Sequence, residues 1–285
     1  MTDVSTEIRR FVGCAGRSLS MEIGGPPEAQ GVLLLHGGGQ TRQAWRKTIH
    51  QLIAAGYQVA AYDLRGHGDS QWAGDEGYSM DAQVADLCSA VALFERPPVL
   101  VGASFGGLIA LVATGEQAVA PAALVLVDVA PQVDRAGENR ILGFMQAHKD
   151  GFASIDEAAN AVAAYLPHRR RPSDNSGLKR NLRQRNNRWF WHWDPKLFDT
   201  LDAAGPQAQP RLERAAASVQ VPTLLIRGAL SELIDEDSVR DFQARVPHAR
   251  SVDVRNAYHM VAGDDNNAFS AAVLQFLEDV RTGKT

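Results

Sequence analysis

The stretch PVLVGASFGGLIALVATG, residues 98–115, joins an apolar run, a glycine-rich turn and a second apolar run. Pro98–Val101 has the short apolar pattern of a buried parallel strand, and Phe105–Gly115 is long enough for a helix. Between them lies the pattern G-x-S-x-G, centred on Ser104. A turn this sharp strains the serine backbone and requires very small residues two positions to either side. The stretch therefore predicts a strand–turn–helix unit that lifts the Ser104 hydroxyl above a sheet.

The chain around this unit alternates in the same way between short apolar runs and longer amphipathic stretches. Further strands are expected at Gly31–Leu35, Gln58–Tyr62, Ala122–Val127 and Pro222–Arg227, with an alternating edge strand at Arg250–Val254. Helices are expected at Trp45–Ala55, Asp81–Phe94 and Phe269–Val280. This order is typical of an α/β fold, in which βαβ units build a mostly parallel central sheet flanked by helices.

The segment after the expected strand Ala122–Val127 breaks this alternation. It has no strand-like apolar run and is expected to be helical, most clearly at Ile155–Leu166. Strand-like runs resume after it, so the chain returns to the same sheet. We therefore interpret residues 132–218 as a helical insertion into one α/β domain that consists of residues 1–131 and 219–285.

Composition limits the classes of protein that fit. The chain has 285 residues, of which 45% are hydrophobic and 22% charged, with a net charge of −4. These values exclude a disordered or coiled-coil chain and argue against a nucleic-acid partner. Cys14 and Cys88 have no disulfide or metal-type spacing. The first residues lack the pattern of a signal peptide, and no apolar run approaches the roughly 20 residues that span a bilayer. We expect a cytoplasmic protein without a membrane partner.

Three more motifs surround Ser104 in a fixed order. They are HGGG at His36–Gly39, DLRGHGDS at Asp63–Ser70 and NAYHM at Asn256–Met260. With these motifs, the chain resembles the α/β-hydrolase superfamily over nearly its whole length except the insertion. The resemblance implies an α/β-hydrolase fold with a helical cap inserted after the sixth strand. It also implies that Ser104 is a nucleophile, activated by a histidine that a carboxylate orients.

The resemblance also indicates the base and the oxyanion hole. Among eight histidines, only His259 lies between the last expected strand and the final helix, where the superfamily carries its base. Attack on an ester carbonyl creates a negative oxygen, which needs preorganised donors about 3 Å away. In this superfamily the donors are two backbone N–H groups, which correspond here to Phe105 and Gly38.

The acid has three candidates. The superfamily order is serine, acid, histidine, with the acid after the penultimate strand, and Glu232 stands there in a Gly-x-x-Ser-acid pattern. Glu232 is therefore the first choice. Asp235 lies in the same loop, but it could instead cap the next helix. Asp128, directly after the strand Ala122–Val127, is the other alternative, because some relatives use that position.

The insertion carries two unusual segments. The first contains Trp189, Trp191 and Trp193, which either line an apolar substrate pocket or pack the insertion onto the sheet. The second contains eight basic residues between Arg169 and Arg188, opposed only by Asp174. Such a segment suits an anionic substrate or an acidic partner, or else forms a solvated face.

The motifs together predict a serine hydrolase that cleaves a carboxylic ester-type bond through an acyl-enzyme, with neither cofactor nor metal. The expected partner is a small-molecule substrate with an apolar or aromatic part. The same triad could also hydrolyse a C–C bond or a lactone, or use peroxide in place of water as a perhydrolase. A receptor-like protein that binds a small molecule could also retain it.

Overall fold

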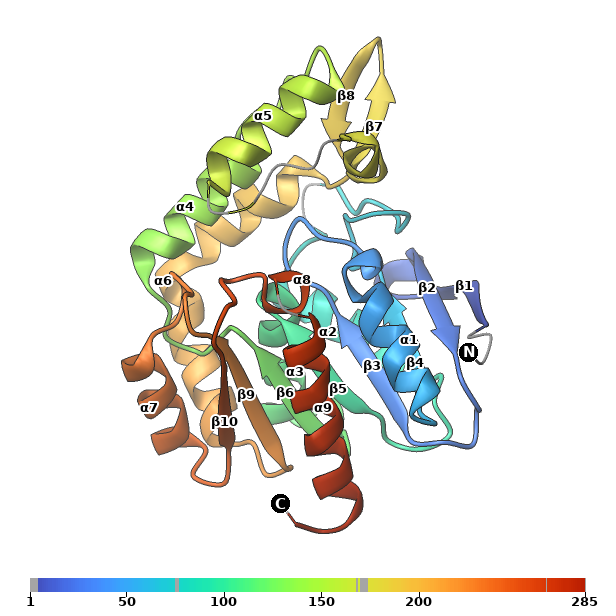
Figure 1. The fold of residues 1–285 in the computed structure, drawn as a ribbon, viewed down its shortest axis with the longest axis vertical. Coiled ribbons are helices and arrows are strands. Elements are labelled where there is room, and N and C mark those ends of the chain that lie inside the picture. The colour runs from blue at the N-terminus through green and yellow to red at the C-terminus, as the bar shows by residue number, and fades with distance from the viewer. Residues whose placement is uncertain (1–4, 75–76, 168, 170–173, 265, 285) are drawn as a thin grey trace.

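The computed structural model describes residues 5–74, 77–167, 169, 174–264 and 266–284 (Figure 1). Its main sheet has eight strands in the order β1-β2-β4-β3-β5-β6-β9-β10. The strands are β1 (Thr6–Val12), β2 (Ser18–Gly24), β3 (Gly31–Leu35), β4 (Gln58–Tyr62), β5 (Val99–Ala103), β6 (Ala123–Val127), β9 (Thr223–Gly228) and β10 (Arg250–Val254). From β4 to β10 neighbouring strands pair in parallel, whereas β1 and β2 are antiparallel additions at one edge.

Helices cover both faces of the sheet. They are α1 (Arg46–Ala54), α2 (Met80–Val91), α3 (Phe105–Gly115), α6 (Pro195–Ala217), α7 (Glu236–Arg245), α8 (Val261–Asp264) and α9 (Asn266–Arg281). In β3, Leu33 and Leu35 join a core with α2, α3, α6 and α7, while Val32 and Leu34 join a second core with α1 and α9. Successive side chains of a strand point to opposite faces, so the two cores explain the nearly continuous apolar runs.

The predicted strands and helices are confirmed with small shifts of their ends, and β10 does lie at a sheet edge. The antiparallel pair β1–β2 was not predicted, because the strands were predicted from short apolar runs. Most of β1 is exposed, so its sequence is polar, and β2 interleaves serine and glutamate with its apolar residues. Among the described residues, no helix is both long enough and apolar enough to cross a membrane.

The insertion lies between β6 and β9, which are parallel neighbours in the sheet. It contains α4 (Arg135–Gln146), α5 (Ile155–Tyr165), a hairpin of β7 (Leu182–Arg185) and β8 (Arg188–Trp191), and α6. Figure 1 shows α4, α5 and the hairpin gathered at one end of the molecule, beyond the sheet.

The hairpin corrects the expectation that the insertion is entirely helical. Asn186 and Asn187 form its two-residue turn with φ values of 48° and 59°. A type I′ hairpin turn requires positive φ at both central residues, and asparagine tolerates it better than most residues. The Asn-Asn pair between two short runs was therefore a local signal for this turn.

Candidate active site

Ser104 occupies the turn between β5 and α3. Its φ is 47°, in a region that residues other than glycine rarely adopt. A Cβ atom added to Gly102 would lie 2.6 Å from Gly106 O, and one added to Gly106 would lie 2.6 Å from His36 O. The Ser104 N–H donates to Val127 O over 3.0 Å, which ties the turn to the neighbouring strand β6. The predicted strand–turn–helix unit is thus confirmed, together with the reason for its small residues.

His259 lies in the loop between β10 and α8, as its position in the sequence predicts. Its Nδ1 is 2.7 Å from Oδ2 of Asp128, the residue directly after β6. Asp128 is fully buried and accepts two more hydrogen bonds, from Gly228 N over 2.9 Å and from Ser231 Oγ over 2.5 Å. Because Nδ1 faces a carboxylate, it carries the ring proton, and Nε2 remains as the basic nitrogen.

The structure does not place Glu232 against the histidine, so that expectation is wrong. Glu232 forms an ion pair with Arg140 of α4, and its side chain is 55% exposed. Asp235 is the N-cap of α7, where its Oδ1 accepts from Ser238 N over 2.8 Å. Of the three candidate acids, the structure brings Asp128 to His259.

The two expected oxyanion donors are backbone N–H groups that have no partner in the described parts of the chain. Phe105 is the first residue of α3, so the helix itself provides no acceptor for its N–H. In the loop after β3, Gly37 N and Gly39 N donate to side chains, which leaves Gly38 N. Within the described parts of the chain, neither Gly38 N nor Phe105 N has a hydrogen-bond acceptor. A Cβ atom built on Gly38 would lie 3.9 Å from that of Phe105, so the two groups are neighbours.

These groups open onto one cavity of about 750 Å³, lined by both the sheet region and the insertion. Ser104, His259, Gly38 and Phe105 contribute to its wall, and much of the remainder is apolar. Examples from the insertion are Leu142, Phe144, Met145, Trp191, Trp193 and Phe198. The candidate catalytic residues thus lie on one wall of a large cavity whose other walls are mostly apolar.

The three predicted tryptophans differ in position. Trp191 and Trp193 line the cavity, and their rings are stacked with centroids 4.8 Å apart. Trp189 is not among the residues of the wall, and its ring instead lies 5.9 Å from Lys179 Nζ. The structure therefore brings two of the three side chains to the cavity.

The charged groups of the insertion are largely engaged. Each arginine in the cavity wall has an acidic partner; the pairs are Arg135–Glu138, Arg169–Asp264 and Arg211–Glu116. In the basic segment, Arg183 pairs with Asp69 and Arg188 donates to the backbone of Asp150 and Gly151. Arg170 and Arg171 lie outside the described residues. Arg169, Arg183 and Arg188 of this segment thus serve internal contacts.

A mostly parallel sheet with a strained serine at its central strand–helix turn is the architecture of the α/β hydrolases. A profile of the alpha/beta hydrolase fold family matches residues 31–265. The chain therefore belongs to this family and is an α/β-hydrolase enzyme.

Relatives agree with this assignment. The chain is 29% identical over 283 residues to esterase Rv0045c of Mycobacterium tuberculosis, covering 93% of this chain and 87% of the relative. It is 26% identical over 250 residues to a 3-hydroxybutyrate-oligomer hydrolase of Cupriavidus necator, covering 84% and 85%. The solved structure of Rv0045c superposes with a TM-score of 0.75 at 26% identity, over 96% of this chain and 92% of that one. E-2-(acetamidomethylene)succinate hydrolase shares the fold, with a TM-score of 0.82 at 19% identity over 96% and 100%.

Proposed function

We propose that the protein hydrolyses a carboxylic ester-type bond through an acyl-enzyme formed on Ser104. The observation that carries this proposal is the convergence of four groups on one cavity: the strained serine, His259 with Asp128 behind it, and two N–H groups that have no acceptor among the described residues. The family contains hydrolases with different substrates, so the reaction type is argued from these groups and the substrate from the cavity.

In the first half of the proposed reaction, Ser104 Oγ attacks the ester carbonyl while His259 Nε2 takes the hydroxyl proton. The Asp128 carboxylate stabilises the imidazolium that forms. The carbonyl oxygen becomes negative and is held by the N–H groups of Gly38 and Phe105. The C–O bond then breaks, and the alcohol leaves with the proton that His259 returns to it. A water molecule repeats these steps on the acyl-enzyme and releases the acid.

The Ser104 hydroxyl is free to take part in this sequence. Among the described residues it makes no hydrogen bond, and both it and His259 line the cavity. Catalytic hydrogen bonds are often loose before substrate binds and shorten in the reacting complex. The contact with Asp128 limits the rotation of the His259 imidazole. We therefore expect the Ser104 hydroxyl to rotate toward His259 Nε2 when substrate binds.

The cavity indicates an ester with a large apolar or aromatic part. A volume of about 750 Å³ lies in the usual range for sites that enclose small molecules. The arginines of the wall are already paired with carboxylates, which makes a neutral substrate a better match than an anionic one. Residues 132–218 supply much of the apolar wall, so we assign this insertion the role of a cap over the site.

Intact-mass analysis after exposure to a fluorophosphonate tests the mechanism. The wild type should gain one adduct, whereas the Ser104→Ala variant should gain none and keep its melting temperature. Hydrolysis of aryl esters with acyl chains from acetyl to dodecanoyl would then test the substrate class, with lactones and diketones included to detect other chemistry. Absence of labelling in the wild type, or esterase activity in Ser104→Ala, would contradict the proposal.

A further inference from the structure

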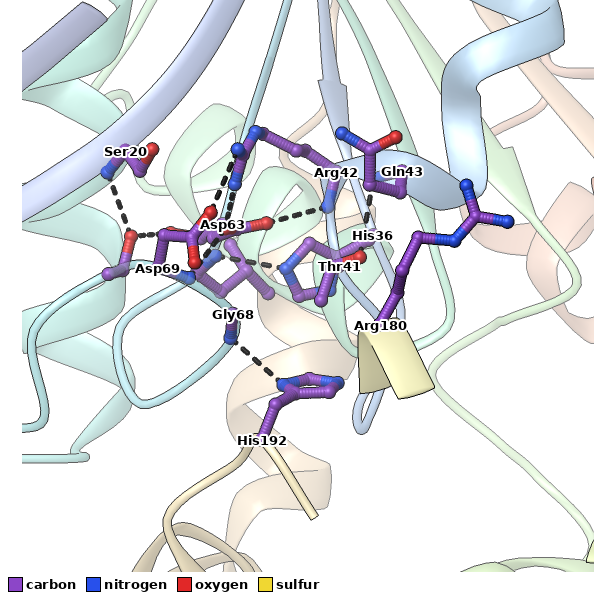
Figure 2. Close-up of polar contacts among 12 residues, drawn as sticks. Ser20, His36, Thr41, Arg42, Gln43, Asp63, Gly68, Asp69, Arg180 and His192 are labelled. Carbon is purple, nitrogen blue, oxygen red and sulfur yellow. Dashed lines mark hydrogen bonds and ion pairs between the residues drawn. The ribbon is translucent and has the colours of Figure 1, made fainter. Parts of the chain in front are cut away.

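His192 makes a polar contact between the insertion and the loop that carries Gly38. It follows β8, and its side chain is almost completely buried. Its Nδ1 accepts a hydrogen bond from Gly68 N over 2.9 Å, and its Nε2 lies 3.2 Å from Gly39 O. Figure 2 shows the His192 ring directed at the Gly68 backbone. Because Nδ1 has to offer its lone pair to Gly68, the ring proton is on Nε2, which donates to Gly39 O.

Gly39 is held from two sides. Its N–H donates to Nε2 of His67 over 3.0 Å, while its carbonyl oxygen accepts from His192. One contact comes from the sheet region and the other from the insertion. The loop consists of glycines, whose backbone is free to adopt many conformations unless other groups fix it. The contacts at Gly39 therefore fix the loop on the carboxyl side of Gly38.

A third histidine fixes the start of the same loop. His36 Nε2 accepts from Leu64 N over 3.0 Å, and its Nδ1 donates to Gly37 O over 2.8 Å. Gly37 O belongs to the same peptide unit as the Gly38 N–H, and it also accepts from Gln40 N over 3.1 Å. Burial lowers the pKa of His36 and of His192 to about 3 and lowers that of His67 well below its ordinary value. All three rings are therefore neutral near pH 7, which keeps each donor and acceptor in place. Of the three, His192 alone belongs to the insertion.

The Gly68 side of the contact is also rigid. Asp69 N donates to Asp63 Oδ2 over 2.9 Å, and Arg42 pairs with both carboxylates (Figure 2). Arg183 on β7 adds a second link from the hairpin, because it donates to Gly68 O over 3.2 Å and pairs with Asp69 over 3.1 Å. This second link does not touch Gly39, which makes Arg183 a matched control for His192.

We propose that His192 is a positioning residue for the oxyanion hole: by holding Gly39 O on the carboxyl side of Gly38, it makes the position of Gly38 depend on the seating of the β7–β8 hairpin. This inference rests on the proposed function, because it assigns Gly38 N as a donor to the reacting oxygen. It gives the insertion a second role besides lining the cavity. The sheet region orients the Gly38 N–H through Gly37 O, and the insertion would hold the other side of Gly38 through Gly39 O.

Two amide substitutions separate the contacts of His192. In His192→Gln the amide nitrogen can replace Nε2 and donate to Gly39 O. In His192→Asn the shorter side chain can replace Nδ1 as acceptor for Gly68 N but cannot reach Gly39. With the ester that the wild type cleaves fastest, His192→Asn should lower kcat by about 10- to 100-fold with KM nearly unchanged, since loss of a whole donor costs about 10²–10³. His192→Gln should restore most of kcat.

Two further measurements distinguish positioning from support. An aryl trifluoromethyl ketone, which forms an oxyanion on Ser104, should bind His192→Asn more weakly by the same factor as kcat/KM falls. An apolar inhibitor without a carbonyl should bind both proteins equally. Arg183→Gln should lower the melting temperature as much as His192→Asn does while leaving kcat within about threefold, since it frees the hairpin but not Gly39.

Each outcome decides the inference. Equal losses of kcat in His192→Asn and Arg183→Gln, or a rise in KM alone, would show that His192 only seats the hairpin. A wild type that turns over esters while His192→Asn keeps full kcat would overturn this inference and leave the proposed function intact. A wild type that neither labels nor turns over would refute the proposed function, and the inference with it.

Discussion

The two walls of the cavity are built from different interactions. In the sheet region the groups are fixed by hydrogen bonds: Asp128 accepts from three donors, and Gly39 is held at both its N–H and its carbonyl. In the insertion the wall consists mainly of packed rings, such as Phe144 and Trp191 with centroids 5.8 Å apart. Loss of one hydrogen-bond partner leaves a buried group unsatisfied, whereas packed groups tolerate replacements of similar volume. We therefore expect one wall to determine the reaction and the other to determine the substrate.

The largest effect should come from the buried carboxylate. Asp128→Asn preserves the shape of the side chain but removes the charge that orients the neutral His259 ring and that, in the proposed mechanism, stabilises the imidazolium. We expect kcat to fall by about 10³–10⁴, as for comparable substitutions in known serine hydrolases. Steady-state kinetics on the preferred ester measures this effect, and the melting temperature checks the fold.

Glu232→Gln is the control for this prediction. Glu232 has an exposed ion pair with Arg140, and such pairs contribute about 0–1 kcal/mol to stability. Its replacement should leave kcat within about twofold of the wild type. A loss of activity in Glu232→Gln as large as in Asp128→Asn would reject Asp128 as the acid of the triad.

A smaller effect, confined to substrate binding, is expected from the insertion wall. Trp191→Ala removes one ring of the stacked pair in the cavity, and burial of an aromatic side chain is worth about 2 kcal/mol. We expect KM for long-chain esters to rise by about 10- to 30-fold, with little change for acetate esters. Measurement of KM across the acyl series tests this expectation.

Trp189→Ala serves as the counterpart, since Trp189 lies beside Lys179 and away from the cavity wall. It should leave the dependence of KM on chain length unchanged. If both variants shift KM alike, the substrate does not use the Trp191 side of the insertion, and the division between the two walls would be incorrect.

The smallest effect concerns pH and the three buried histidines. The pKa of His192 is about 3 in the folded protein and near its ordinary value of 6.5 in the unfolded chain. Between these values the unfolded state binds more protons, so this contribution to stability is complete above pH 6.5 and is lost as the pH falls toward 3. From pH 7 to pH 5, the free energy of unfolding should therefore fall by about 1–2 kcal/mol less in His192→Gln than in the wild type. Chemical unfolding at a series of pH values measures this difference. Parallel curves for the two proteins would exclude a neutral buried imidazole at this position.

Much of the fold and of the site can be predicted from short stretches of the sequence. The parallel strands are buried on both faces and therefore read as apolar runs, and the turn at Ser104 requires glycines that are visible as a motif. These features depend on residues close to one another in the chain, so spacing and composition suffice to predict them. His259 is different, because its place between the last strand and the final helix indicates a base only through the resemblance to the α/β-hydrolase superfamily.

The acid could not be chosen in the same way. Asp128 follows β6 and Glu232 follows β9, and these strands are neighbours whose carboxyl ends meet at one edge of the sheet. The choice between them depends on the φ of 52° at Asp128, on the hydrogen bond from Ser231 and on the pairing of Glu232 with Arg140. The two contacts join residues that are distant in sequence, and the backbone angle of Asp128 cannot be predicted from its residue type.

Ser104 and Asp128 share a property with a consequence for evolution in the laboratory. Both follow directly on neighbouring strands, and both have left-handed backbone conformations, with φ of 47° and 52°. Such conformations cost about 1–3 kcal/mol each in residues other than glycine. A selection for heat resistance alone would therefore reward glycine at Ser104 and discard the proposed nucleophile, whereas glycine at Asp128 would leave the buried Gly228 N–H without its acceptor. Selection for a more durable catalyst has to screen for turnover in every round.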